Sequence, residues 1–357
     1  MPPRELDERD VRVRPGRGSR PRTKQRPAHA DAVRGFVTGV DRGRYQVLVA
    51  GQPVVAMKAR DLGAQRVVPG DGVDLVGDLS GRSGSLARIV RIAPRRTVLR
   101  RTADDTDPTE RVVVANADQL VIVTALTDPT PRTRMIDRCV VAAYDAGMDA
   151  LLVLTKADLA DPEPLTALYA AAGVASVATR LDGDQIVGLD ALRTALTDQV
   201  SVLVGHSGVG KSTLVNALVP GADRATGLVN EVTGRGRHTS TSAVALPLPR
   251  TGTDDGPATD GAYTDGAHTG TWVIDTPGVR SFGLAHVDPA HLLAAFTDLA
   301  AVAEASCPRG CTHLADAPDC ALDDWVAETS TDSHRRAARL DSLRRLLSSR
   351  LDTDDPD

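Results

Sequence analysis

The chain has 357 residues, of which 41% are hydrophobic and 25% charged, so it has material for two or three soluble domains with a real core. No apolar run is long enough to span a bilayer, and the first twenty residues lack the apolar core of a secretory signal. We therefore expect a cytoplasmic protein that does not engage a membrane. The net charge of −5 is uneven, because residues 1–101 carry 22 Lys and Arg against 10 Asp and Glu. This basic front predicts a polyanionic partner, the alternative being a solvated basic tail without a ligand.

The first hundred residues change character near residue 32. Residues 1–31 are rich in Arg, Pro and Gly and almost devoid of apolar side chains, so we expect a disordered basic tail. Residues 32–98 show short β-type runs such as "RYQVLVA" and "LARIVRIA", separated by Gly, Asp, Arg or Ser clusters. Five strands with positive charge predict an all-β, oligonucleotide-binding (OB-like) barrel that binds RNA. An SH3-like barrel is a fair alternative on the pattern alone.

The rest of the chain is predicted to form two further domains. Residues 99–288 alternate between strand and helix patterns, which predicts a mainly parallel sheet covered on both faces. Within this domain, residues 250–270 lack periodicity and are rich in Gly, Thr, Asp and Ala, so we expect a flexible insertion. Residues 289–357 are predicted to be helical. They end in an amphipathic helix whose apolar side carries Leu340, Leu343, Leu346 and Leu347.

A guanine-reading motif ends the apolar run "LLVLT". It consists of Thr155, Lys156, Ala157 and Asp158. The Asp158 carboxylate can accept hydrogen bonds from N1–H and the exocyclic amino group of guanine, whereas adenine offers neither pattern, so the motif predicts GTP and not ATP. The usual motif opens with Asn, and we expect Thr155 to weaken a scaffold contact while leaving the base-reading carboxylate in place.

A phosphate loop follows about fifty residues later. The stretch "GHSGVGKST" at 205–213 fits G-x-x-x-x-G-K-[ST] and lies between a strand pattern and a helix pattern. Its backbone N–H groups and the helix N-terminus can surround phosphate oxygens, with Lys211 charged toward the β- and γ-phosphates and Ser212 offering a hydroxyl to Mg²⁺. The residues expected to contact the nucleotide here are Gly205, His206, Ser207, Gly208, Val209, Gly210, Lys211, Ser212 and Thr213.

Two downstream segments are expected to complete the phosphate end of the site. Asp275-Thr-Pro-Gly278 begins at the end of the apolar run "TWVID", so Asp275 can hold Mg²⁺ through water and the Gly278 N–H can contact the γ-phosphate. The loop at 234–243 lies where small GTPases keep a Thr that binds Mg²⁺. Thr239 is our first choice for that residue and Thr241 the alternative, because spacing does not separate them.

The catalytic group is less evident, because Val279 occupies the position of the Gln that orients water in many GTPases. An apolar side chain cannot orient water, so another group must do so or intrinsic turnover is slow. His238 is the nearest candidate, since imidazole can accept a proton near pH 7. The alternative is a loop histidine without a catalytic role.

The motif order is inverted relative to an ordinary small GTPase, because the base motif precedes the phosphate loop. This order predicts a circular permutation, which moves the chain ends and leaves the contacts of the sheet intact. The segment after Asp275 then leads directly toward the C-terminal helices. We hypothesise that γ-phosphate contacts at Gly278 move those helices, so that domain orientation reports the nucleotide state.

Three cysteines and one histidine cluster within fourteen residues near the C-terminus. Three thiolates and one imidazole fill a closed tetrahedral Zn²⁺ site, which predicts one structural zinc ion. The expected ligands are Cys307, Cys311, His313 and Cys320. The fourth cysteine, Cys139, lies in a helix pattern and is expected to be a buried small hydrophobe.

Together these segments resemble the RsgA family of circularly permuted bacterial GTPases, which act late in small ribosomal subunit assembly. The match rests on "VANADQLVIV", "LTKADL", "GHSGVGKSTLVNAL", "GRGRHTSTS", "DTPGVRSFGL" and the Cys/Cys/His/Cys cluster, over about residues 33–345. The resemblance implies a GTPase checkpoint on the small subunit and its rRNA, stimulated by that subunit, with an apolar residue at the position of Val279. We expect GTP or GDP with Mg²⁺ as ligands and a monomeric chain. The alternatives are a non-hydrolysing, nucleotide-gated RNA-binding adaptor and an ATP-dependent kinase.

Overall fold

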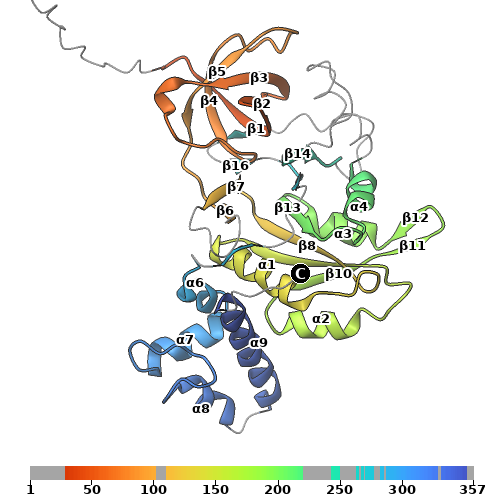
Figure 1. Cartoon of the computed structure of the whole chain (residues 1–357), viewed down its shortest axis with the longest axis vertical. Helices are drawn as coiled ribbons and strands as arrows, with labels where there is room; N and C mark the ends of the chain where they lie inside the picture. Colours follow the sequence, from red (N-terminus) through yellow and green to blue (C-terminus); the bar gives the residue numbers. More distant parts are fainter. Residues whose placement is uncertain are drawn as a thin grey trace, which may run out of the picture. The chain divides into compact units, whose positions relative to one another are not determined.

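A computed structural model describes residues 29–101, 110–219, 243–249, 263–264, 267–268, 270–276, 282–284, 287–328 and 331–351 (Figure 1). The chain divides into two units, residues 1–31 and 32–357. Residues 1–28 of the expected disordered tail lie outside the described residues.

Five strands of the second unit form a closed β-barrel, as expected. They are β1 (Val33–Asp41), β2 (Arg44–Val49), β3 (Gln52–Lys58), β4 (Gly72–Gly77) and β5 (Ala87–Ile92). β1 pairs with β2 and β2 with β3, β3 runs parallel to β5, and β5 pairs through β4 back to β1. Alternate side chains, including Val37, Val47, Leu75 and Ile89, fill the interior, since successive residues of a strand face opposite sides. A short 3-10 helix, Arg60–Leu62, follows β3.

The central sheet has six strands in the order β10, β9, β8, β13, β17 and β14. Their bounds are β10 Ala175–Ala178, β9 Asp149–Thr155, β8 Gln119–Ala125, β13 Val200–Gly205, β17 Trp272–Asp275 and β14 Val244–Pro247. The first five are parallel and β14 is antiparallel to β17. All residues of β8 and β13 are buried, as expected of strands covered on both faces. One bridge, Gly39 to Val244, connects β14 to barrel strand β1.

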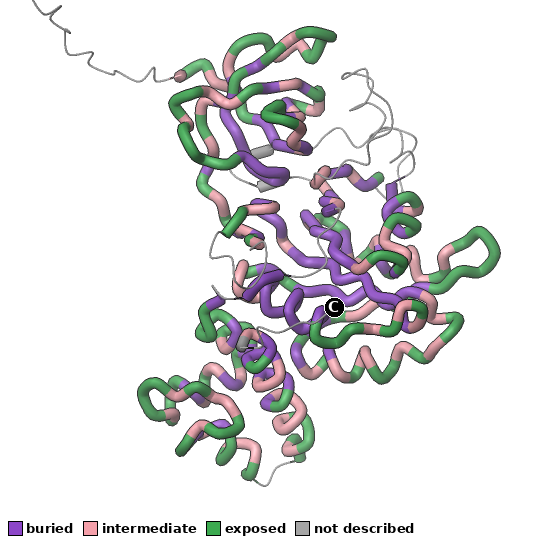
Figure 2. Tube along the Cα trace, in the orientation of Figure 1, coloured by how far each residue is buried: buried purple, intermediate pink, exposed green. Residues whose placement is uncertain are grey.

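Helices cover both faces of the central sheet (Figures 1 and 2). On one face, Ile122, Leu152 and Val202 pack with α1 (Thr133–Asp145) and with Tyr169 of α2 (Glu163–Ala170). On the other face, the alternate residues Val121 and Val153 pack with α3 (Leu189–Leu196) and α4 (Lys211–Leu218). Cys139 of α1 is buried as predicted, and burial raises the pKa of its thiol to about 12.

Four further helices lie near the C-terminus: α6 (Pro289–Ala294), α7 (Thr297–Ser306), α8 (Ala321–Ala327) and α9 (Ser333–Leu351). The predicted apolar side of α9 is confirmed, since Leu340, Leu343, Leu346 and Leu347 are at most 5% exposed and join the core that contains α1. The arginines of α9 also reach neighbours. Ion pairs join Arg339 to Asp298, Arg344 to Asp323 and Arg345 to Asp137. No helix in the described ranges is long and apolar enough to cross a membrane.

Three short antiparallel pairs were not anticipated. They are β6 (Val98–Arg101) with β7 (Arg111–Ala115), β11 (Arg180–Asp182) with β12 (Gln185–Val187), and β15 (Tyr263–Thr264) with β16 (Ala267–His268). The last pair falls inside the 250–270 segment that we expected to be a flexible insertion. Most of that segment lies outside the described residues.

Asn116 ties the barrel to the strand that enters the central sheet. Its side-chain amide donates to the Gly70 carbonyl at 2.9 Å and accepts from the Arg96 N–H at 2.8 Å. Gly70 has φ 90°, and a Cβ there would lie 1.9 Å from the Ala115 carbonyl oxygen, so only glycine permits this approach. Asn116 is 3% exposed and itself adopts a left-handed conformation with φ 56°. The side chain therefore satisfies two backbone groups that belong to different segments.

We predict that Asn116→Ala lowers the free energy of unfolding by about 1–3 kcal/mol, because it leaves buried backbone groups unpaired. Urea-induced unfolding measures this change. Asn216→Ala on the exposed surface of α4 is the control and should stay within about 0.5 kcal/mol of the parent. Equal stability of the two variants would contradict the assigned tie.

Candidate functional site

Three predicted motifs lie at one edge of the central sheet. Thr155, Gly205 and Asp275 are the last residues of β9, β13 and β17, and parallel strands end at a common edge. In register, Thr155 lies opposite Ala125 and Gly205 opposite Val123, so the single strand β8 separates the base motif from the phosphate loop. Ligands of open α/β sheets bind beyond this carboxyl edge. The inverted motif order of the sequence therefore yields neighbouring loops.

The phosphate loop runs from the end of β13 into α4. A Cβ on Gly205 would lie 2.6 Å from the Val123 carbonyl oxygen, and Gly208 and Gly210 have φ of 83° and 90°, so all three positions favour glycine. Val209 is 2% exposed and packs into the core beneath the loop. These constraints hold the loop against the sheet, with α4 beginning at Lys211. Such a loop at a helix N-terminus suits a phosphate group.

Lys211 and Asp275 lie together at the phosphate end of the site. The ammonium group of Lys211 forms an ion pair with the Asp275 carboxylate, and the two side chains are 13% and 29% exposed. The adjacent Thr276 hydroxyl donates to the Leu203 carbonyl at 2.7 Å, which fixes the end of β17 against β13. The group expected at the phosphates and the group expected at Mg²⁺ thus meet at one point.

Thr155 joins the base motif to the phosphate loop. We expected it to weaken a scaffold contact, but its hydroxyl donates to the Val209 carbonyl at 2.7 Å and lies 3.3 Å from the Thr124 carbonyl. Its side chain also lies against Gly210, where an added Cβ would be 3.8 Å away. Thr155 is only 6% exposed, so this hydrogen bond is shielded from water. The threonine therefore supplies a direct contact between the two halves of the site.

The remaining base-motif residues are less buried than Thr155, and Ala157 packs against the edge of the main core. Lys156 adopts φ 59° and its ammonium donates to the Asp128 carbonyl, while Asp158 is exposed. The Ala157 N–H donates to the Thr179 carbonyl at 3.1 Å, just beyond the end of β10. We did not anticipate that Thr179 and the loop around Asp128 border this motif. The signal was available, because β10 and β8 flank β9 and end at the same edge.

Five predicted residues lie outside the described part of the chain. They comprise the candidate catalytic group, both candidate Mg²⁺-binding threonines and the two residues after Asp275-Thr-Pro: His238, Thr239, Thr241, Gly278 and Val279. Their assignments stay predictions.

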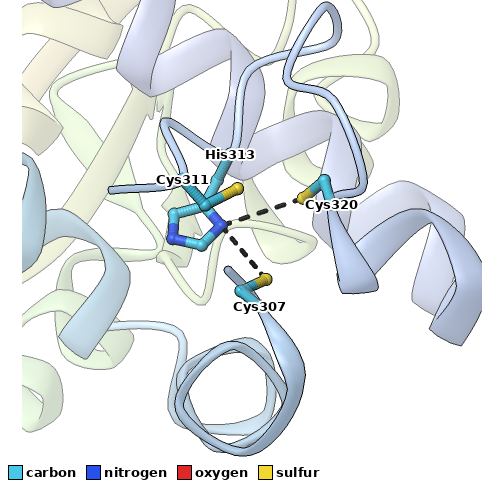
Figure 3. A group of neighbouring side chains, drawn as sticks. All are labelled: Cys307, Cys311, His313 and Cys320. Atoms are coloured by element: carbon cyan, nitrogen blue, oxygen red, sulfur yellow. Dashed lines mark hydrogen bonds between the residues drawn. The ribbon is translucent and has the colours of Figure 1, made fainter. Parts of the chain in front are cut away.

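The predicted metal ligands form one cluster between α7 and α8 (Figure 3). The ligand atoms of Cys307, Cys311, His313 and Cys320 all lie within 4.8 Å of one another. His313 turns its Nδ1 atom toward two sulfurs, at 3.7 Å from Cys307 Sγ and 3.8 Å from Cys320 Sγ. A tetrahedral ion with Zn–S bonds of about 2.3 Å needs ligand atoms roughly 3.5–3.8 Å apart. The cluster fits a zinc site.

Electrostatics at the cluster also suit a metal. Burial lowers the pKa of His313, and the nearby Arg344 guanidinium lowers it further, so the imidazole is neutral near pH 7 as a ligand must be. Burial raises the pKa of Cys320, which disfavours an isolated thiolate there. A bound cation stabilises such a thiolate, because its charge offsets the loss of hydration. The three cysteines and the histidine therefore suit a site in which a bound metal ion stabilises the thiolates.

We predict that Thr155→Val lowers both the affinity for GDP and the free energy of unfolding, the latter by about 1–3 kcal/mol, because the buried Val209 carbonyl loses its donor while the side-chain shape is kept. Fluorescence titration with labelled GDP and urea unfolding measure the two effects. Thr155→Ser, which keeps the hydroxyl, should retain most of the affinity. If the Val variant binds GDP as well as the Ser variant, the contact does not organise the site.

Comparison with known proteins agrees with this geometry. The RsgA GTPase family model matches residues 92–285. The small ribosomal subunit biogenesis GTPase RsgA of Gemmatimonas aurantiaca is 35% identical over 267 residues, 74% of this chain and 79% of that protein. The protein of the same name from Pseudomonas syringae pv. tomato is 36% identical over 265 residues, 73% of this chain and 69% of that protein.

Solved structures share the fold. YjeQ from Thermotoga maritima matches with a TM-score of 0.60 and 23% identity, over 90% of this chain and 99% of that one. YloQ, a circularly permuted GTPase, matches with a TM-score of 0.60 and 19% identity, over 92% and 98%. The inverted motif order along the chain thus agrees with the fold of a structure described as a circularly permuted GTPase. The chain belongs to the RsgA GTPase family.

Proposed function

We propose that this GTPase hydrolyses GTP to GDP and phosphate while bound to the small ribosomal subunit, and that it acts there as a late assembly checkpoint. The observation that carries the proposal is the hydrogen bond between Thr155 and Val209, which unites a guanine-reading motif with a phosphate loop. The relatives that match most of the chain are named small ribosomal subunit biogenesis GTPases. Nucleotide chemistry thus follows from the site, and the ribosomal partner from the family.

In this proposal the two motifs bind opposite ends of one nucleotide. The exposed Asp158 carboxylate accepts hydrogen bonds from guanine, and the backbone of residues 205–213 surrounds the phosphates. When the nucleotide binds, the Lys211 ammonium leaves its ion pair with Asp275 and contacts the phosphate oxygens instead. That exchange leaves the Asp275 carboxylate available to the hydrated Mg²⁺ ion that accompanies the nucleotide. Ser212 and either Thr239 or Thr241 supply the hydroxyl ligands of that ion.

Hydrolysis needs a water molecule placed in line with the γ-phosphate, and Val279 cannot orient one. We assign this task to His238, whose imidazole accepts the proton of the attacking water. His238 and Thr239 both lie between α4 and β14 in the sequence, outside the described residues. The subunit would stimulate turnover by positioning His238, because a catalytic base contributes only when it is positioned.

We infer that the barrel, residues 32–98, is of the OB type and binds rRNA. The inference is supported by its strand order, with β3 parallel to β5, which suits a closed five-stranded Greek-key barrel. Some of its arginines pair with acids, such as Arg95 with the buried Asp71. Arg44 and Arg88 are instead exposed, and both are in register with the exposed Met57 across β2, β3 and β5. Charge beside an apolar side chain suits RNA, which offers phosphates and stacked bases.

The remaining assignments complete the proposal. Residues 99–288 form the permuted GTPase domain, and residues 289–357 form a helical domain with one structural zinc ion. The chain acts as a monomer. Its ligands are GTP and GDP, with the small subunit and its rRNA as partners.

We predict that purified small subunits accelerate GTP hydrolysis by about 10²-fold or more, because positioning a catalytic base contributes on that scale. Phosphate release is measured with and without small subunits, with large subunits as the negative control and Lys211→Ala as the inactive variant. Absence of phosphate release in both conditions would favour the non-hydrolysing adaptor. Thermal stabilisation by ADP in place of GDP would favour the kinase alternative.

A further inference from the structure

Arg344 connects helix α9 to the loop that carries the metal ligands. Its Nε atom donates to the His313 carbonyl at 3.2 Å, and its Nη2 atom donates to the Asp323 carboxylate of α8 at 2.8 Å. The guanidinium therefore contacts the loop between Cys311 and Cys320 on one side and the helix that follows Cys320 on the other. Its side chain is only 17% exposed, whereas that of Asp323 is 51% exposed, so water screens the contact with His313 less than the contact with Asp323.

The backbone at His313 needs such support. Its φ is 58°, in the left-handed region that residues with a Cβ adopt uncommonly. This conformation brings the ring Nδ1 atom back toward Cys307 and Cys320, as Figure 3 shows. A hydrogen bond to the carbonyl of the same residue fixes the orientation of its peptide group. The donor comes from a helix anchored by Leu343, Leu346 and Leu347 in the main core.

Charge gives Arg344 a second role. Three thiolates, one neutral imidazole and Zn²⁺ carry one net negative charge, which burial disfavours. Arg344 contacts segments on both sides of Cys320, since it donates to His313 in the loop before it and to Asp323 in the helix after it. The positive charge of the guanidinium is therefore held beside the loop that supplies the thiolates. Partners outside the ligand set commonly tune metal affinity by about 10–100-fold.

We propose that Arg344 is a positioning residue of the zinc site, holding His313 in its ligating conformation and offsetting the negative charge of the thiolates. This inference rests on the proposed zinc ion. It assigns to α9 a specific function in metal retention, in addition to its packing against α1. The retention of zinc then depends on the correct docking of α9.

The test measures zinc release from the full-length protein to a chromogenic chelator. Arg344→Gln should release zinc about 10–100-fold faster than the parent. Arg344→Lys keeps the charge but loses the forked geometry, so its rate should lie between the two. Arg335→Gln makes the same charge change at an exposed position of the same helix and should stay within about twofold of the parent. A release rate for Arg344→Gln within twofold of the parent would overturn the proposal.

Two readouts separate positioning from a general loss of structure. Unchanged GDP affinity of Arg344→Gln would show that the nucleotide site is intact. After cobalt(II) substitution, the sulfur-to-metal charge-transfer band should move to longer wavelength in Arg344→Gln and not in Arg335→Gln, because the thiolates lose a neighbouring positive charge. An unshifted band would contradict the electrostatic role.

A second pair of variants covers the case in which Arg344→Gln does not fold. Asp323→Asn removes the charge of one partner of the guanidinium and so weakens that contact, and it should accelerate zinc release by a smaller factor than that expected for Arg344→Gln. Asp324→Asn, at the adjacent exposed acid, should match the parent. Equal rates for these two variants would overturn the proposal. Absence of zinc from the purified parent protein would instead refute the zinc site itself, and Arg344 would then have no metal to position.

Discussion

The hydrogen bond from the Thr155 hydroxyl to the Val209 carbonyl passes over the end of β8 and connects the two halves of the nucleotide site. It is possible only because β8, β9 and β13 are parallel neighbours whose carboxyl ends form one edge. This geometry depends on which strands are neighbours in the sheet and not on their order along the chain. A permuted chain can therefore assemble the same site, provided that the strand order in the sheet is kept.

Permutation does change the segment to which the last strand of the sheet is joined. After β17 the chain leads into the helical segment, and the described residues of this connection are held from two sides. Arg138 of α1 donates to the Phe282 carbonyl at 3.0 Å, and Arg350 of α9 donates to the Val287 carbonyl at 3.2 Å. Any nucleotide-dependent movement that starts near Gly278 must therefore break these contacts or carry α1 and α9 with it. If the C-terminal domain moves with the nucleotide state, the contacts of Arg138 and Arg350 must therefore change or move with it.

The sequence was most informative where one local pattern determines the structure. The buried strands β8 and β13, the glycines of the phosphate loop and the apolar side of α9 follow from periodicity and backbone sterics alone. The ligand cluster followed from donor type and spacing. Contacts between distant segments could not be predicted in this way. Thr155 was expected to weaken a scaffold contact because the usual motif opens with Asn. Its actual partner, Val209, lies 54 residues away, and the partners of Arg344 are likewise set by helix docking.

The central claim is that the base motif and the phosphate loop bind one guanine nucleotide, and exchanging the base tests it most directly. Xanthine carries a carbonyl where guanine carries its amino group, so Asp158→Asn should lose GDP affinity by about 10²-fold or more and gain affinity for xanthosine diphosphate. Adding Lys211→Ala to that variant should abolish the new binding, because the same ligand also needs the phosphate loop. Xanthosine diphosphate binding that is not gained in the first variant, or that persists undiminished in the second, would contradict a single shared site.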